Sequence, residues 1–170
     1  EKGLDVMTIK LERIFPESKN NNFLPSFFAS IKAKEKGKDD ALFQDRFGHV
    51  TEATTGNIFF FKDGILTTSS SKILKGVTRK IIIHFAKKNK IQVIEKMFNL
   101  GELFDADEIF ISGTTKFIVP VIKINNRKIS MGRPGFLTIK LRKELTDYLF
   151  EKENEFGETI TSIKKIAKKV

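Results

Sequence analysis

The sequence of 170 residues contains no cysteine, no tryptophan, one tyrosine and two histidines. Without cysteine, the chain forms no disulfide, holds no metal through thiolates and has no thiol nucleophile. His49 and His84 have no neighbours at metal-ligand spacing, so we expect no metal site. No apolar run approaches the ~20 residues of a membrane-spanning helix, so we expect no membrane partner and a cytoplasmic protein.

Acidic residues are also fewer than basic ones. Lysine and arginine number 31 against 21 aspartate and glutamate residues, which gives a formal charge of +10 and favours anionic partners in general. However, the lysines are scattered, and the 17 phenylalanines do not alternate with arginine as they would on an RNA-stacking surface. We therefore expect no nucleic-acid partner. A basic nucleic-acid-binding module remains the alternative from another class of function.

The apolar pattern predicts one domain in which hairpins and helices alternate. A hydrophobic content of 40% in 170 residues is enough for one substantial core. The predicted strands are 4–11, 41–44, 49–53, 57–61, 65–68, 91–95, 108–112 and 118–124, and the predicted helices are 25–36, 76–89, 99–104 and 136–151. This order predicts an α/β (mixed α+β) fold, with helices packed on a mixed sheet that contains hairpins.

Four segments carry the residues of chemical interest. Lys19 lies in the polar loop 15–22 between a predicted strand and a predicted helix, a position where functional residues concentrate. Glu52 lies in a strand among apolar residues, where a buried carboxylate needs a partner. Segments 73–79 and 113–115 are small-residue loops, and the first opens a helix whose free N–H groups can bind phosphate. Each signal is weak when it is taken alone.

In this order, the four segments resemble the class IV aminotransferases. That family holds D-amino-acid and branched-chain aminotransferases and aminodeoxychorismate lyase, and it adopts fold type IV of the pyridoxal-phosphate enzymes. The resemblance runs from about Asp5 to about Lys143 and covers only the larger, C-terminal domain. It implies that residues 1–152 form the cofactor-binding large domain and that 153–170 form a basic, helical extension. The chain begins with Glu, and we expect a piece of a protein whose small N-terminal domain is absent here.

The resemblance also implies roles for single residues. Lys19 would bond covalently to pyridoxal 5′-phosphate and move protons at the substrate. Glu52 would face the pyridine nitrogen and keep it protonated by charge pairing. The other implied contacts are Leu74 on the cofactor ring, Val77, Thr78 and Thr114 on its phosphate, and Thr115 towards the substrate carboxylate. Gly56 departs from the family pattern, in which many members have Ser or Glu.

The implied reaction is transamination, which moves an amino group between an amino acid and a 2-oxo acid. A lyase that eliminates pyruvate from a chorismate-derived amine remains the alternative. A homodimer is implied for the complete protein. Because an arginine that binds the phosphate belongs to the small domain, we expect the isolated chain to be inactive and to bind the cofactor weakly. We also expect it to expose an unusually apolar surface.

Overall fold

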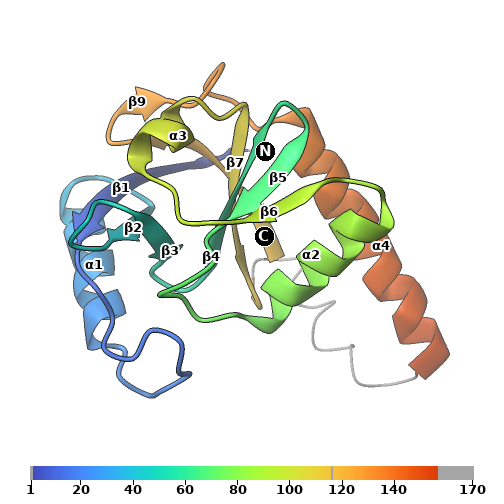
Figure 1. Cartoon of the computed structure of the whole chain (residues 1–170), viewed down its shortest axis with the longest axis horizontal. Coiled ribbons are helices and arrows are strands. Elements are labelled where there is room, and N and C mark those ends of the chain that lie inside the picture. Colours follow the sequence, from blue (N-terminus) through green and yellow to red (C-terminus); the bar gives the residue numbers. More distant parts are fainter. Residues whose placement is uncertain (1, 116, 157–170) are drawn as a thin grey trace.

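The computed structural model describes residues 2–115 and 117–156, and in it helices pack against a mixed sheet (Figure 1). The strands are β1 (Leu4–Lys10), β2 (Asp40–Gln44), β3 (Val50–Ala53), β4 (Asn57–Lys62), β5 (Ile65–Thr68), β6 (Val93–Glu95), β7 (Glu108–Gly113), β8 (Phe117–Ile124) and β9 (Arg127–Lys128). The helices are α1 (Leu24–Glu35), α2 (Val77–Lys88), α3 (Leu100–Phe104) and α4 (Phe136–Phe156). The predicted fold class is confirmed.

The strands of the described residues form one sheet that partly closes on itself. Their order is β3-β2-β1-β8-β7-β4-β5-β6, with β9 paired to β8. β3 also pairs with β4, through Glu52 and Asn57, so six strands form a closed ring. β1 is parallel to β2 and β8, whereas β4 is antiparallel to β3, β5 and β7. This closure places Glu52 directly opposite the strand that follows it in sequence.

Strand β4 is buried on both faces. Ile58 and Phe60 belong to the cluster inside the ring, whereas Phe59 and Phe61 belong to a second cluster outside it. The alternation follows from the two-residue period of a strand. The Phe60 ring meets Phe98 edge to face at 5.0 Å between centroids inside the ring. Four successive apolar residues are thus needed here, because neither face of β4 is exposed to water.

Helices α2 and α4 cover the outer face of the sheet. The second cluster joins Phe59 and Phe110 of the sheet to Ile82 of α2 and to Leu141 and Leu145 of α4. The Phe59 and Phe110 rings are stacked, with centroids 4.9 Å apart. Both helices lie on the same side of the strands in Figure 1, so they share one layer of the core.

Helix α1 packs against β1 and β2 through its small residues. Ala29 and Ala33 are fully buried, whereas Phe27, Phe28 and Ile31 are 63%, 46% and 39% exposed. The small side chains allow the helix to approach the sheet closely, and the large ones therefore project outwards. This apolar outer face of α1 agrees with the expected exposure of apolar surface.

Two tight turns contain consecutive residues with positive φ. Asp63 and Gly64 have φ of 50° and 76°, as a type I′ turn requires, and Asp-Gly in the sequence favours this turn between β4 and β5. Asn125 and Asn126 have φ of 49° and 69° and lead into β9. β9 was not predicted, because two residues are too few for an alternating pattern.

The C-terminal helix α4 extends to Phe156, beyond the predicted end at residue 151. It thus passes through the predicted boundary between 152 and 153. The greater part of the expected basic extension, 157–170, lies outside the described residues. No helix within 2–115 and 117–156 is both long and apolar enough to cross a bilayer.

Candidate functional site

Glu52 is a buried carboxylate on β3, as its apolar neighbours in the sequence predicted. It is 5% exposed. Arg13 Nε donates to Glu52 Oε1 at 2.7 Å, and the backbone N–H of Leu74 donates to Oε2 at 3.1 Å. Burial raises the pKa of Glu52, while the charge and hydrogen bond of Arg13 and the amide of Leu74 lower it in part. Each carboxylate oxygen therefore keeps the capacity to accept a further donor.

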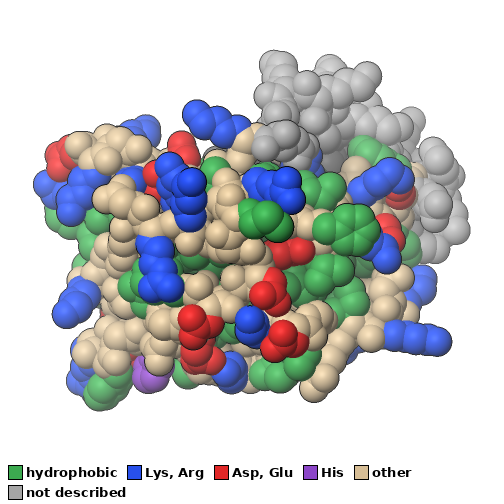
Figure 2. All heavy atoms as spheres, turned by 90° about the horizontal axis from the view of Figure 1, so that it is seen from above, with side chains coloured by type: hydrophobic (Ala, Val, Ile, Leu, Met, Phe, Trp, Pro, Cys, Tyr) green, Lys and Arg blue, Asp and Glu red, His purple; other side chains and the backbone are tan. Residues whose placement is uncertain are grey.

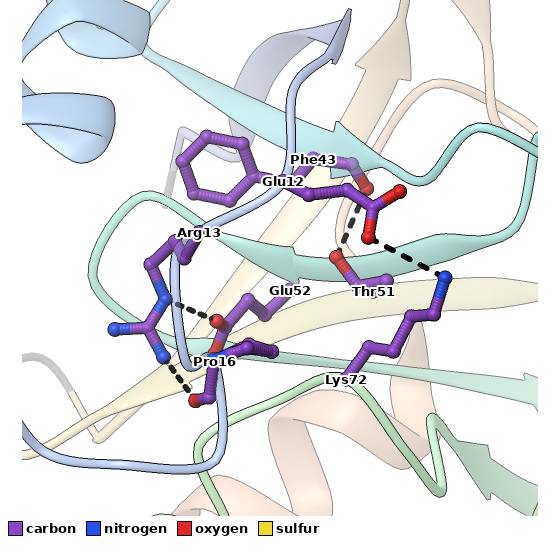
Figure 3. A pocket seen from close by; sticks show the side chains of 7 residues that line it. All are labelled: Glu12, Arg13, Pro16, Phe43, Thr51, Glu52 and Lys72. Carbon is purple, nitrogen blue, oxygen red and sulfur yellow. Dashed lines mark hydrogen bonds and ion pairs between the residues drawn. The ribbon is translucent and has the colours of Figure 1, made fainter.

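A small pocket lies beside Glu52 (Figure 3). It is lined by Glu12, Arg13, Pro16, Phe43, Thr51, Glu52 and Lys72. Arg13 spans the pocket wall, because its Nη2 also donates to the carbonyl oxygen of Pro16 at 2.5 Å. The segment that carries Pro16 therefore covers one side of Glu52.

Leu74 is held to the same strands by both of its backbone groups. Its N–H binds Glu52, and its carbonyl oxygen accepts from Asn57 Nδ2 at 2.7 Å. A Cβ on Gly76 would lie 3.0 Å from Asn57 Oδ1, so a glycine allows the chain to pass close to the strand. Glu52 and Asn57 are paired across β3 and β4. The two residues therefore fix where α2 begins.

The start of α2 has exposed donors and no acidic side chain. Gly76 is the N-cap residue, no side chain caps the helix, and its first turn contains no Asp or Glu. The first N–H groups of a helix have no partner within the helix and carry a partial positive charge. Thr78 is buried, whereas Val77 is 71% exposed and is not the core residue that helical spacing predicted. This helix end offers N–H donors to an anion.

The turn 54–56 packs against the end of β7. A Cβ on Gly56 would lie 2.2 Å from the carbonyl oxygen of Ser112, and one on Gly113 would lie 3.2 Å from that of Thr55. A side chain at position 56 would therefore collide with the backbone of β7 in this chain. The turn that contains Thr114 and Thr115 is exposed and follows Gly113 directly.

Lys19 lies on the exposed loop between β1 and α1. The loop is ordered by its own hydrogen bonds, from Ser18 N to the Phe15 carbonyl oxygen at 3.0 Å and from Asn22 N to Asn20 Oδ1 at 3.0 Å. Among the contacts of the described residues, none joins the Lys19 amine to Glu52. The structure thus brings Glu52, Leu74 and the start of α2 into contact, and it connects the Lys19 loop to them only through Arg13.

The two histidines have different surroundings in the described structure. His49 Nδ1 lies 3.2 Å from Asp45 Oδ2, which also accepts from Lys72 Nζ at 2.9 Å. His84 is exposed on α2. No cluster of His, Cys, Asp or Glu in 2–115 and 117–156 could hold a metal ion.

Sequence reasoning missed Arg13, Asn57 and Ser112. Asn57 stands five residues after Glu52. A second polar residue, directly before the apolar run 58–61, was a signal that could have pointed to it. Ser112 faces Asn57 across β4 and β7, and within the described residues its buried hydroxyl has no hydrogen-bond partner. Arg13 gave no signal, because it is one of many cations and its partner is 39 residues away.

The sequence profile of the family described as amino-transferase class IV matches residues 3–124. The chain belongs to the class IV aminotransferase family. A branched-chain-amino-acid aminotransferase of Pseudomonas aeruginosa is 34% identical over 146 residues, which are 85% of this chain and 48% of that protein. A D-alanine aminotransferase of Listeria monocytogenes is 38% identical over 135 residues, which are 78% of this chain and 46% of that protein. The predicted family is therefore confirmed.

Solved structures of class IV aminotransferases show the same fold. The branched-chain amino acid aminotransferase of Thermobaculum terrenum, crystallised in its PLP-form, superposes with a TM-score of 0.83 at 30% identity. The match covers 91% of this chain and 53% of that one. This class IV chain thus spans about half the length of the curated relatives that it matches.

Proposed function

We propose that this chain is the cofactor-binding part of a pyridoxal-phosphate-dependent aminotransferase, which moves an amino group between an amino acid and a 2-oxo acid. The observation that carries the proposal is the contact of Glu52 with Leu74. It joins a buried carboxylate to the loop that opens α2, whose start has no acid of its own. A carboxylate and an anion-binding helix end, held at a fixed separation, suit a ligand with a cationic ring nitrogen and a phosphate.

The phosphate end of pyridoxal phosphate fits the α2 start. The free N–H groups after Gly76 and the Thr78 hydroxyl are donors, and the exposed Val77 leaves the helix end open. Thr114 would add a second hydroxyl from the turn after Gly113. The exposed position of Thr114 and the lack of an acidic residue in the first turn of α2 suit a dianion.

The ring end fits Glu52. A buried carboxylate that accepts one hydrogen bond at each oxygen can accept a further donor, and a protonated pyridine nitrogen would supply both that donor and a positive charge. Leu74, whose backbone Glu52 and Asn57 hold in place, would pack its side chain on the ring face. The residues present therefore fit the group.

Each residue has a role that follows from its chemistry. When bound, pyridoxal phosphate supplies an electron sink for the electron pair left on the substrate Cα. Lys19 Nζ would hold the cofactor covalently and then take the proton from the substrate Cα. Glu52 would keep the proton on the ring nitrogen, and Thr115 would orient the substrate carboxylate.

We further propose that residues 1–152 act as the large domain of a homodimeric, cytoplasmic enzyme. The exposed apolar side chains of α1 and the preceding loop support a surface that is covered in the assembled protein. These are Ile14, Phe15, Phe23, Leu24, Phe27, Phe28 and Ile31. Sedimentation of the protein over a concentration series tests this, and a monomer at all concentrations would contradict it.

A nucleic-acid partner is not part of the proposal. In the face shown in Figure 2, lysine and arginine side chains are interspersed with acidic and apolar ones rather than gathered in a stripe. Nucleic-acid binding relies on clustered cations and weakens steeply with salt. Tight, salt-dependent binding to polynucleotides would contradict this reading.

Borohydride reduction in the presence of pyridoxal phosphate, followed by peptide mapping, tests the proposed function. We expect the label on Lys19 and its loss in Lys19→Ala. Donor assays with branched-chain L-amino acids and with D-alanine then identify the amino donor. Release of pyruvate together with 4-aminobenzoate from the chorismate-derived amine would instead indicate the lyase reaction. A label on a different lysine would overturn the assignment.

A further inference from the structure

Arg13 follows β1, and its guanidinium bridges two parts of the candidate site (Figure 3). Nε donates to Glu52 Oε1 at 2.7 Å, and Nη2 donates to the Pro16 carbonyl oxygen at 2.5 Å. Pro16 lies in the same loop as Lys19. The side chains of Arg13 and Glu52 are 15% and 7% exposed. One largely buried side chain therefore connects the strand of Glu52 to the loop of Lys19.

Arg13 also dominates the charge around Glu52. Burial raises the pKa of Glu52, and the Arg13 charge is the main effect that lowers it, followed by the Leu74 amide. Lys72 and Glu12 line the same pocket, but Lys72 pairs with Glu12 and with Asp45. Of the cations in the described part of the chain, Arg13 is the one that contacts the Glu52 carboxylate.

The guanidinium group suits both tasks at once. It is planar, permanently charged and carries donors in a rigid fork, so two acceptors can be bound in a defined relative position. A lysine in the same place would supply a charge from a flexible stem but would not reach both acceptors in one geometry. Charge and two-point attachment can therefore be separated by substitution.

We propose that Arg13 is a positioning residue, which holds the Glu52 carboxylate by an ion pair through Nε and fixes the Lys19 loop relative to that carboxylate through Nη2. The inference rests on the proposed function, in which Glu52 faces the ring nitrogen and Lys19 bonds to the cofactor. Arg13 acts through Glu52 and Pro16 and not on the reacting atoms.

Three substitutions test the two tasks in the cofactor-free chain. Arg13→Gln removes the charge and the two-point attachment. Arg13→Lys keeps the charge and removes the attachment to Pro16. Arg127→Gln is the matched control, because Arg127 is exposed on β9, where its guanidinium lies 4.4 Å from the centre of the Phe104 ring.

The first measurement is the titration of Glu52 by NMR of the chain with ¹³C-labelled glutamate carboxyl groups, assigned by the signal lost in Glu52→Gln. We expect Arg13→Gln to raise the pKa of Glu52 further, because burial then acts almost unopposed. Arg13→Lys should leave it near the wild-type value, and Arg127→Gln should not change it. An unchanged titration in Arg13→Gln would overturn the proposal.

The second measurement is hydrogen exchange of the amides in 14–23. We expect faster exchange in both Arg13→Gln and Arg13→Lys and none of this acceleration in Arg127→Gln. Wild-type exchange in both Arg13 variants would overturn the positioning role. If Arg13→Gln fails to fold, Arg13→Gln combined with Glu52→Gln should fold again, since no charge is then buried alone. Failure of that rescue would overturn the charge argument.

Labelling of Lys19 separates this inference from the proposed function. If Lys19 of the wild type is labelled by reduction with pyridoxal phosphate, and the Arg13 variants behave as the wild type in both measurements, the positioning role fails while the function stands. If another lysine is labelled, the function fails, and with it the role of Arg13 in the site, whatever the titration of Glu52 gives.

Discussion

Asp45 and Glu52 are both buried carboxylates, 1% and 5% exposed, but their surroundings differ. Asp45 accepts from Lys72 Nζ and from the backbone N–H groups of Phe47 and His49, and the His49 ring is beside it. Burial tends to raise its pKa, and these bonds together bring that pKa well below the ordinary range. The two donors at Glu52 leave its pKa raised. Asp45 thus has more hydrogen-bond donors from the fold than Glu52 has.

The starts of α4 and α2 show the same contrast. Glu108 accepts from the backbone N–H of Leu137 at 2.9 Å and from that of Thr138 at 2.6 Å, so its carboxylate closes the start of α4. The start of α2 has no such carboxylate. Both helices pack in the same outer cluster, so the difference does not come from their place in the fold.

The buried polar groups of this chain differ in how many partners the fold gives them. Polar groups that serve the fold are paired within it, because an unpaired buried group costs stability. Glu52, whose pKa is raised, and the α2 start, which no side chain caps, adjoin each other through Leu74. Their closeness supports the proposed cofactor site.

The largest expected effect separates the two carboxylates by function. Glu52→Gln should retain the cofactor in the complete protein but slow turnover roughly 100-fold or more, since loss of the charge pair adds about 3 kcal/mol to the barrier. Asp45→Asn should leave turnover per folded molecule near the wild-type value. Steady-state kinetics measure both, and near-normal turnover of Glu52→Gln would show that this carboxylate does not face the ring nitrogen.

Val77→Asp should place a carboxylate at the start of α2, as Glu108 does at the start of α4. The added carboxylate repels a phosphate, and we expect cofactor affinity to fall about 30- to 100-fold, equivalent to about 2–3 kcal/mol. The cofactor-free chain should gain a few tenths of a kcal/mol. Val77→Asn is the matched neutral control. Titration by absorbance checks the affinity, and equal binding by both variants would contradict a phosphate at this helix end.

Asp45→Asn should lower the free energy of unfolding by about 2 kcal/mol at neutral pH, because buried hydrogen bonds to a charge are lost. The folded-state pKa of Asp45 is lowered, so its stabilisation is complete above its ordinary pKa of 3.8 and disappears as the pH falls through the folded-state value. The difference in urea-unfolding free energy between the two proteins should therefore stay constant from pH 7 down to about 3.8 and become smaller as the pH falls further.

Glu52→Gln in the cofactor-free chain is the opposite case. The folded-state pKa of Glu52 in the wild type is raised. The stability that Glu52 contributes is therefore complete below its ordinary pKa of 4.5 and is lost as the pH rises. If the loss of unfolding free energy changed with pH in the same direction in Asp45→Asn and in Glu52→Gln, the contrast between the two carboxylates would be wrong.

The smallest expected effect concerns the closed helix start. Glu108→Gln should cost about 1 kcal/mol of unfolding free energy, because a neutral amide caps α4 less well than a carboxylate. Glu144→Gln is the control, since Glu144 forms an exposed pair with Lys140 on the same helix and should change stability little. Urea denaturation measures both, and equal losses would show that Glu108 is not a special cap.

Much of the fold followed from local patterns. The strand at 57–61, its hairpin to 65–68 and the burial of Glu52 were all predicted from a few neighbouring residues, because strand pattern and turn type are local properties. The exposure of Phe27 and Val77 did not follow in this way. A helix pattern shows which residues are apolar, but the partner surface decides which face is buried.

The sequence by itself determined the family, the element order and the residues that the family would use, because these depend on residue type and spacing along the chain. Only the tertiary structure decided that Arg13 meets Glu52, that Lys72 meets Asp45 and that β3 closes onto β4. These contacts join distant segments, and their geometry depends on how the whole sheet closes. For the same reason, the contrast between the lowered pKa of Asp45 and the raised pKa of Glu52 is a property of the fold.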